Sequence, residues 1–296
     1  AIGNRFLFGA AAAALIVTTI AWDRIGRSLS PGTMTRSYFG VYTIESGNRR
    51  SRTLVHGTTL HGAQNLGSIE LERTPTTYYV PESGVGLALT AAPQLFGGEA
   101  RIDVVGLGTG TLACYARPGQ TWTFYEIDPA VAAIASDPTQ FTFLSQCAPD
   151  ARIIIGDARL SLSSATPSAA DVLVVDAFSS DSIPMHLLTK EAFAAYRRRL
   201  TNRGLLLVHI SNRHLDLQPV LAGASADGWE ARVRIFRASP EDLASNRMTS
   251  HWVALSPSGK SLDELIEASG QKEWHVLSEP RPIAWTDDYG SLLPLI

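Results

Sequence analysis

Two acidic side chains in a serine-rich loop are the residues of this sequence best suited to chemistry. Asp176 ends an apolar run, and Asp181 lies five residues later, shortly before Pro184. A carboxylate can attract an ammonium group, hold it and accept its proton, which prepares an amine for nucleophilic attack. We expect Asp176 to be the base and Asp181 to anchor the charge of a substrate. Capping of a turn and of a helix is the structural alternative for the two residues.

Three glycines follow the first apolar run of the C-terminal part: Gly106, Gly108 and Gly110 in VVGLGTGT. Glycines between a strand and a helix let the backbone approach a ligand at the N-terminus of the helix. We expect these glycines, with Thr109 between them, to bind a cofactor. Thr111 stands where the GxGxxG fingerprint has its third glycine, which disfavours a nicotinamide cofactor.

Acidic residues end the next two predicted strands. Glu126 lies 20 residues after Gly106, where a carboxylate can accept both hydroxyls of a ribose, and Asp128 follows in the same turn. One strand later, Gly156, Asp157 and Ala158 place a short acid that suits an adenine amino group. Because the carboxyl ends of parallel strands meet at one edge of a sheet, the sequence predicts a nucleoside-binding crevice there.

The elements that must position these residues follow a strand, loop, helix rhythm. Apolar runs separated by helical stretches indicate strands that are buried on both faces of a mainly parallel sheet. We therefore predict a doubly wound α/β fold with a mainly parallel sheet. The runs are 102–108, 123–128, 152–158, 171–178 and 204–211, and alternating residues at 37–45 and 52–56 predict a small antiparallel β unit before them.

Composition bounds the classes of function. The chain has 296 residues, of which 45% are hydrophobic and 18% are charged, so a sizeable core is expected and disorder is excluded. A net charge of −3 without a basic run makes nucleic acid a poor partner. We divide the chain into an apolar helix and linker at 1–35, the β unit at 36–80 and a nucleoside-binding catalytic domain at 81–296.

Cys114 and Cys147 are the two cysteines of the chain. So few thiols in a long chain fit a reducing compartment and no disulfide framework, and we interpret both as small buried hydrophobic residues. A single bridge between them remains open.

The segment from Phe6 to Trp22 carries no charge over 17 residues. A helix that spans a bilayer needs about 20 apolar residues, with roughly 17 as the lower limit. A membrane anchor, a secretory signal peptide and a buried or interfacial helix are the three interpretations. We expect membrane association through residues 6–22 and a location at the cytoplasmic face of the membrane, or in the cytoplasm if the segment does not span.

Three stretches resemble the spermidine synthase-like proteins among the class I S-adenosylmethionine-dependent transferases. They are HGTTLHGAQ at 56–64, FYEIDPAV together with GDAR, and VLVVDAFSSDSIP at 172–184. The resemblance covers residues 37 to 290 and implies a seven-stranded, mainly parallel sheet of the methyltransferase type, which is Rossmann-like. It is strongest to the membrane-associated branch, of which TDDY at 286–289 and HISNR at 209–213 are also typical.

The resemblance implies roles for individual residues. Gln64 falls on the nucleoside-contacting Gln of polyamine aminopropyltransferases, Glu126 on the ribose position and Asp157 on the adenine position. The 172–184 stretch falls on the acidic catalytic loop of the family, beside which we place Tyr79 as a further catalytic residue. The expected walls of the substrate pocket are Tyr78, Phe178, Trp285, Asp287, Asp288 and Tyr289.

The implied activity is transfer of an aminopropyl or related alkyl group from decarboxylated S-adenosylmethionine, or from S-adenosylmethionine, to an amine such as putrescine, with release of methylthioadenosine. No metal is expected, because the seven histidines are scattered and show no ligand spacing. Enzymes of this class are often dimeric, and by that analogy we expect a homo-oligomer.

Two departures from the family pattern keep other reactions open. Thr109 stands where spermidine synthases carry an Asp that binds the free amine of the decarboxylated donor, and Ala177-Phe178 lengthen the acidic loop. Intact S-adenosylmethionine could then serve methyl transfer, aminocarboxypropyl transfer or an intramolecular cleavage by a lyase or cyclase. A non-catalytic sensor on a membrane is a further alternative. His209, at the end of a strand, faces the crevice or is a structural histidine.

Overall fold

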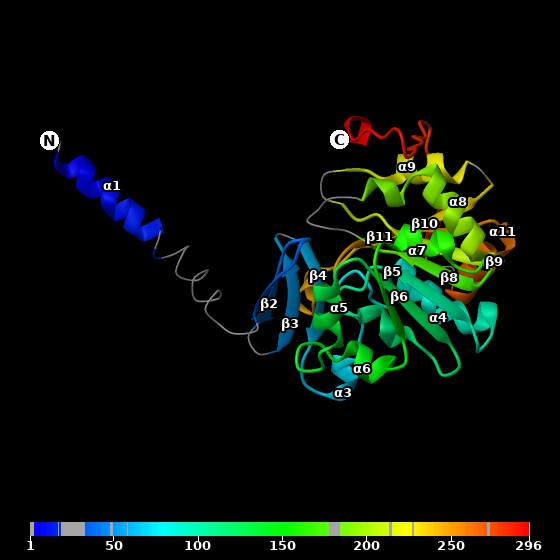
Figure 1. The fold of residues 1–296 in the computed structure, drawn as a ribbon, viewed down its shortest axis with the longest axis horizontal. Coiled ribbons are helices and arrows are strands. Elements are labelled where there is room, and N and C mark those ends of the chain that lie inside the picture. The colour runs from blue at the N-terminus through cyan, green and yellow to red at the C-terminus, as the bar shows by residue number, and fades with distance from the viewer. Residues whose placement is uncertain are drawn as a thin grey trace.

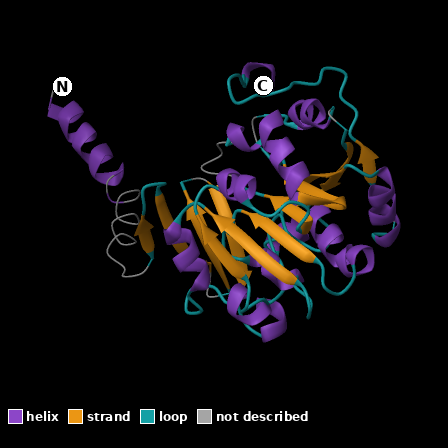
Figure 2. Ribbon diagram, turned by 45° about the vertical axis from the view of Figure 1, so that its right-hand side comes forward, coloured by secondary structure: helices purple, strands orange, loops and turns teal. Residues whose placement is uncertain are grey.

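The computed structural model describes residues 3–16, 18, 33–47, 50–57, 59–177, 184–212, 215–226, 228–270 and 273–295. A large central sheet carries helices on both of its faces, and a smaller N-terminal sheet lies beside it (Figures 1 and 2). This is the predicted α/β architecture, with a mostly parallel central sheet and a small antiparallel sheet before it.

The central sheet has eight strands in the order β12-β10-β11-β9-β8-β5-β6-β7 within the described residues. From β9 to β7 all neighbours are parallel, whereas β10, β11 and β12 pair antiparallel. The structure thus has one strand more than the seven that were predicted, and it includes the short β12 of three residues at one edge. The strands are β5 (Arg101–Val105), β6 (Thr121–Glu126), β7 (Arg152–Ile155), β8 (Ala170–Val175), β9 (Leu200–His209), β10 (Glu230–Phe236), β11 (Ser250–Ser256) and β12 (Trp274–Val276).

The chain changes direction within this sheet between β5 and β8. After β5 it adds β6 and β7 on one side, and it then returns to add β8 and β9 on the other side. In open α/β sheets, ligands bind outside the carboxyl ends of the strands at such a switch point. The topology therefore places the ends of β5, β6, β7 and β8 around one crevice.

Helices close both faces of the sheet because alternate side chains of each strand enter different cores. In β8, Val172 and Val174 belong to one core with helices α4 and α11, while Leu173 and Val175 belong to the other with α7, α8 and α9. Burial of each such aliphatic side chain contributes about 1.5–3 kcal/mol. The helices of the domain are α4 (Gly84–Phe96), α5 (Pro129–Ser136), α6 (Phe143–Cys147), α7 (Ala158–Ser164), α8 (Lys190–Arg199), α9 (Gln218–Ser225), α10 (Pro240–Ala244) and α11 (Gly259–Ala268), with the 3-10 turns η2 (Thr111–Tyr115), η3 (Met185–Leu187) and η4 (Leu293–Leu295).

The small sheet packs against α5. Its strands, in the order β1-β2-β3-β4, are antiparallel, and Tyr42 and Leu54 form a separate core with Val131 and Ile134 of α5. The small sheet therefore closes one side of the crevice. Its elements are β1 (Met34–Arg36), β2 (Val41–Gly47), β3 (Ser51–His56), β4 (Thr59–Asn65) and the following helix α3 (Ile69–Glu72).

The apolar N-terminal segment is helical over α1 (Gly3–Ile16), which has 14 residues. Among the described residues, no helix combines the length and the apolar character that a bilayer crossing requires. Residues 17 and 19–22 of the segment for which we expect membrane association lie outside the described part of the chain.

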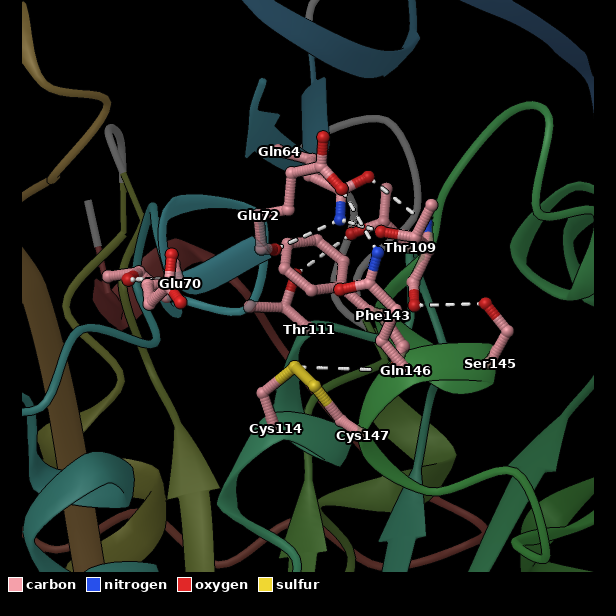
Figure 3. Close-up of a disulfide and its surroundings, with 12 residues drawn as sticks. Gln64, Glu70, Glu72, Thr109, Thr111, Cys114, Phe143, Ser145, Gln146 and Cys147 are labelled. Atoms are coloured by element: carbon pink, nitrogen blue, oxygen red, sulfur yellow. Dashed lines mark hydrogen bonds between the residues drawn. A yellow bond between two sulfur atoms is a disulfide. The ribbon is translucent and has the colours of Figure 1, made fainter. Parts of the chain in front are cut away.

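Cys114 and Cys147 form a disulfide that joins η2 to α6 (Figure 3). Their Cα atoms lie 4.8 Å apart, within the range that a disulfide spans. The interpretation of both as free hydrophobic thiols is therefore wrong. Because disulfides persist in oxidising surroundings, the argument from few thiols to a reducing compartment fails as well.

Candidate active site

A cavity of about 600 Å³ opens at the carboxyl ends of the parallel strands. This volume falls within the range of small-molecule sites. Its walls come from the glycine loop after β5, the turns after β6, β7, β8 and β9, the segment before α4 and the strand β4. The predicted crevice at the switch point is thus present as a cavity.

Gly106 and Gly108 line this cavity and allow close packing of the glycine loop. Both have positive φ angles, +93° and +54°. A Cβ atom on Gly106 would lie 2.1 Å from the carbonyl oxygen of Asp176, and one on Gly108 would lie 2.6 Å from that of His61. The two glycines therefore bring the loop against the end of β8 and against β4, which positions the reactive part of the cavity.

Thr109 and Gly110 lie behind the glycine loop rather than in the cavity wall. The Thr109 side chain is buried and its Oγ1 lies 2.9 Å from Oγ1 of Thr111, while Gly110 caps η2 with a φ angle of +82°. Both were expected to bind a cofactor. In this structure they support the conformation of the glycine loop, Thr109 through its contact with Thr111 and Gly110 as the first residue of the turn into η2.

Glu126 is held in the cavity wall by two backbone N–H groups. Leu107 donates to Oε2 at 3.0 Å and Asp128 donates to Oε1 at 2.9 Å. Burial raises the pKa of the carboxyl above its usual value, and the two backbone hydrogen bonds oppose this rise. Each carboxylate oxygen keeps accepting capacity. The side chain can therefore accept two hydroxyls of a ligand from a fixed orientation.

The side chain of Asp128 makes hydrogen bonds within the protein and does not line the cavity. It is the N-cap of α5, where Oδ1 accepts the N–H of Ala130 at 2.8 Å, and Oδ2 accepts the hydroxyl of Ser37. Only 1% of the residue is exposed, and it is not part of the cavity wall. The expected cofactor contact is replaced by a link between the small sheet and α5.

The turn after β7 presents Gly156, Asp157 and Ala158 to the cavity. Asp157 caps α7, with Oδ1 accepting the N–H of Leu160 at 3.0 Å. Its Oδ2 lies 3.8 Å from Nε2 of His186. One oxygen thus fixes the side chain, while the other lies near the imidazole of His186.

Gln64 is fully buried, and both hydrogens of its amide group are donated to protein partners (Figure 3). Its amide nitrogen donates to the carbonyl of Glu72 at 3.0 Å and to Oγ1 of Thr142 at 2.7 Å, and its oxygen accepts the Thr142 N–H at 3.1 Å. The side chain is not in the cavity wall. In this structure Gln64 links β4 to the start of α6, and its contact with a nucleoside stays a prediction.

Asp176 lies at the opposite end of the cavity from the turn after β7. Its Oδ1 is 2.7 Å from Nδ1 of His209, and the Tyr79 hydroxyl is hydrogen-bonded to the same carboxylate. Burial alone would raise the pKa of Asp176, but His209 and the hydrogen bond from Tyr79 outweigh burial and lower it. Burial and the charge of Asp176 raise the pKa of Tyr79, which keeps its proton to donate. Asp176 is therefore an anion at neutral pH.

Four histidines line the cavity: His61, His186, His209 and His251. Burial, reinforced by the neighbouring His56, lowers the pKa of His61 to about 4, and burial also lowers the pKa of His251. Sequence analysis found only His209 among the four. The other three histidines follow no sequence motif that would have indicated a site. Ser211, two residues after His209, also lines the cavity and was not expected there.

The late acidic and aromatic residues lie outside the cavity wall. Trp285 is 1% exposed and donates to the carbonyl of Ser291 at 3.2 Å. Asp287 pairs with Arg159 and accepts the hydroxyl of Thr189 at 2.9 Å. These contacts attach the C-terminal segment to the domain, whereas Asp288 and Tyr289 are solvent-exposed. A substrate contact of these residues stays a prediction.

Tyr78 and Tyr79 both line the cavity as expected, with the Tyr78 ring centroid 5.1 Å from that of His209. Phe178 and Asp181 lie outside the described residues. Among the residues that are described, no three His, Cys, Asp or Glu side chains gather as a metal-binding set.

Comparison with known proteins places this fold. No family model matches the chain. It is 29% identical to a polyamine aminopropyltransferase of Vibrio vulnificus over 136 residues, which cover 44% of this chain and 42% of that relative, so the match spans less than half of the curated protein.

Solved structures agree over a longer part of the chain. A probable spermidine synthase from Corynebacterium glutamicum matches with a TM-score of 0.62 and 18% identity over 88% of this chain and 97% of its own. Spermidine synthase from Thermotoga maritima matches with a TM-score of 0.55 and 14% identity, over 86% and 80%. A spermidine synthase in complex with the transition state analogue AdoDATO matches with a TM-score of 0.53 and 14% identity, over 86% and 80%. The resemblance to spermidine synthase-like proteins is confirmed, and the chain has their fold. Likeness to the membrane-associated branch stays a prediction.

Proposed function

We propose that this protein is a transferase that moves an aminopropyl group from decarboxylated S-adenosylmethionine to an amine and releases methylthioadenosine. The observation that carries the proposal is one cavity with a ribose-type acceptor, Glu126, in its wall and a buried anion, Asp176, at a separate end. Sequence similarity to a polyamine aminopropyltransferase supports the same reaction.

The nucleoside part of the donor fits the side of the cavity formed after β5, β6 and β7. Glu126 would accept the two ribose hydroxyls, and the turn of Gly156, Asp157 and Ala158 would face the adenine. Leu107 and Leu112 supply apolar wall on the same side. When bound, the donor supplies the sulfonium leaving group, and the protein supplies alignment and charge.

The amine would bind at the end that holds Asp176. An ammonium group is attracted by a carboxylate whose pKa is lowered, because that carboxylate stays ionised at neutral pH. The rings of Tyr78 and Tyr79 border the same end and restrict where an amine can lie. An amine held between this anion and the sulfonium carbon would be aligned for displacement. A small amine such as putrescine is the acceptor that we propose.

Intramolecular cleavage of S-adenosylmethionine is the second candidate, because one observation favours the intact donor. Thr109 is buried behind the loop and paired with Thr111, so it neither attracts the free amine of a decarboxylated donor nor repels the carboxylate of the intact one. The glycine loop, which is described in full, therefore has a threonine and no acid at position 109 that would select the decarboxylated donor.

The test is a product assay with both donors. The purified protein is incubated with S-adenosylmethionine or its decarboxylated form, with and without putrescine, and nucleosides are identified by mass spectrometry. Methylthioadenosine that requires both the decarboxylated donor and the amine supports the proposal. Its release from the intact donor without an amine supports the lyase, and S-adenosylhomocysteine would indicate methyl transfer.

Paired variants show whether the products come from this cavity. Asp176→Asn removes the anion at the amine end, whereas Asp150→Asn makes the same change at an exposed position outside the cavity. We expect the first to abolish amine-dependent product and the second to leave it unchanged. Full activity of Asp176→Asn would remove Asp176 from the mechanism.

Association with a membrane through residues 6–22, a cytoplasmic location and a homo-oligomer stay predictions from the sequence.

A further inference from the structure

The anion at the amine end of the cavity is the first link of a hydrogen-bonded chain. Nδ1 of His209 lies 2.7 Å from Oδ1 of Asp176, and Nε2 of His209 lies 2.7 Å from Oγ of Ser211. The backbone N–H of His251 donates to the same Oγ at 2.8 Å. Asp176, His209, Ser211 and His251 all line the cavity.

Protons in this chain can be placed by counting donors. An ionised Asp176 only accepts, so Nδ1 of His209 carries a hydrogen. The Ser211 oxygen already accepts the N–H of His251, and its single hydrogen is then available for Nε2 of His209. This assignment follows from the hydrogen-bond network. In this assignment, Nε2 of His209 accepts the hydrogen of the Ser211 hydroxyl in the cavity wall.

Asp176 itself is a weak proton acceptor in this arrangement. His209 and Tyr79 both hydrogen-bond to its carboxylate and favour the ionised form. A carboxylate that is stabilised in this way holds and orients a positive charge better than it retains a proton. Imidazole is the side chain whose protonation changes most readily near neutral pH.

We propose that His209 accepts the proton of the substrate amine through the hydroxyl of Ser211, and that Asp176 orients and stabilises the resulting imidazolium. The inference rests on the proposed aminopropyl transfer. In the step, Ser211 takes one N–H proton of the ammonium and passes its own proton to Nε2 of His209. The freed electron pair of the amine forms the new C–N bond, and the electron pair of the breaking C–S bond stays on sulfur, which turns the sulfonium into a neutral thioether.

The surroundings of His209 suit a ring that becomes charged. Trp252 stacks on it with ring centroids 4.6 Å apart and an interplanar angle of 16°. The face of an indole stabilises a cation. Tyr78 contacts the ring from another side.

The titratable groups that face His209 or Asp176 come from four directions. They are Asp176 after β8, His61 on β4, His251 on β11, and Tyr78 and Tyr79 before α4. The lowered pKa values of His61 and His251 keep these rings neutral, and the raised pKa of Tyr79 keeps its hydroxyl protonated. Among these described groups, Asp176 is the one that carries charge at neutral pH.

The experiment compares His209→Gln with the control His275→Gln, which makes the same change on an exposed residue of β12. Glutamine can still donate to Asp176 but cannot take up a proton. We expect kcat of His209→Gln to fall by about 10²–10⁴-fold at pH 7. The rate of the variant should then rise about tenfold per pH unit above neutral, because free amine replaces the missing base, while its Kd for methylthioadenosine stays that of the wild type. Ser211→Ala should show the same slope with a smaller loss.

Several outcomes separate this inference from the proposed function. A loss that is uniform across pH, or a weakened Kd for methylthioadenosine, would assign His209 a structural role and overturn the inference. An unchanged kcat would overturn it too. If the wild type forms no product with either donor and any amine tested, the proposed function fails, and the transfer role of His209 fails with it.

A readout without turnover checks the proton placement. In ¹⁵N-histidine spectra of the wild type, His209 should be the Nδ1-protonated tautomer, and this preference should weaken in Asp176→Asn. A wild-type spectrum of the Nε2-protonated tautomer would contradict the proposed chain, whatever the activity.

Discussion

Loss of the disulfide between Cys114 and Cys147 should destabilise the protein by an amount that depends on the length of the loop that the bridge closes. The bridge closes a loop with a sequence separation of 33 residues. The chain-entropy model assigns about 4 kcal/mol at 25 °C to a loop of this size, because the bridge restricts the unfolded chain. For a protein of this length, that corresponds to roughly 6 °C in Tm.

The perturbation is the double variant Cys114→Ala/Cys147→Ala, measured by urea unfolding beside the wild type with and without dithiothreitol. We expect the free energy of unfolding to fall by about 4 kcal/mol in the variant. Reductant should bring the wild type to the same value and leave the variant unchanged. Equal unfolding energies of oxidised and reduced wild type, or two titratable thiols in the unreduced denatured protein, would refute the reasoning.

The same bridge should affect ligand affinity through η2. Thr111 and Leu112, which line the cavity, lie in the same turn as Cys114, and α6 on the other side of the bridge is tied to β4 through Gln64 (Figure 3). Reduction would loosen this wall without removing a contacting side chain. Weaker binding of methylthioadenosine to reduced wild type, together with no effect of reductant on the double variant, is the expected result in calorimetry.

Three further predictions concern buried carboxylates. Glu126→Gln places an NH2 group against one of the backbone N–H groups of Leu107 and Asp128, which leaves a buried donor without an acceptor and should cost about 1–3 kcal/mol of stability. Methylthioadenosine affinity should fall by about 10–100-fold, and calorimetry showing unchanged affinity would exclude the ribose role. Because burial raises the pKa of Glu126, the wild-type affinity should begin to fall at a pH above the range of an ordinary glutamate, about 4.3. Proton uptake by a group whose folded-state pKa is the higher one favours the folded state, so urea unfolding should show no parallel loss of stability from this group. Arg199→Met leaves Asp103 buried without its partner at 2.7 Å and should cost about 3–5 kcal/mol in urea unfolding, whereas a loss below 1 kcal/mol would show that the pair is not needed.

Most of the central sheet could be predicted from the sequence, because strands buried on both faces leave apolar runs. The run at 102–108 contains most of β5, and the run at 171–178 contains most of β8. The short β12 has three residues and no such pattern, so the eighth strand depends on its pairing with β10. Local sequence indicates an element only where the element is long enough to repeat its pattern.

The cavity residues found from the sequence are those whose position depends on their own strand. Glu126 ends β6 and Asp157 follows β7, so both lie at the carboxyl edge whatever the rest of the chain does. The protein partners of Gln64 and Asp287 could not be predicted, because they are distant in the chain. Thr142 lies 78 residues from Gln64, and Arg159 lies 128 residues from Asp287. A polar side chain does not reveal whether it faces a ligand or a distant protein group.

The pairing of Asp176 with His209 shows what register adds to such a sequence. Val175 of β8 lies opposite Val208 of β9 in a parallel ladder. The residues that follow them, Asp176 after β8 and His209 at the end of β9, therefore lie next to each other. A slip of one residue would turn the His209 side chain to the other face of the sheet and break its contact with Oδ1 of Asp176. Sequence analysis could place each residue near the crevice, but only the strand order makes β8 and β9 neighbours. The choice of proton acceptor therefore depends on this parallel register as much as on the acids of the loop that follows β8.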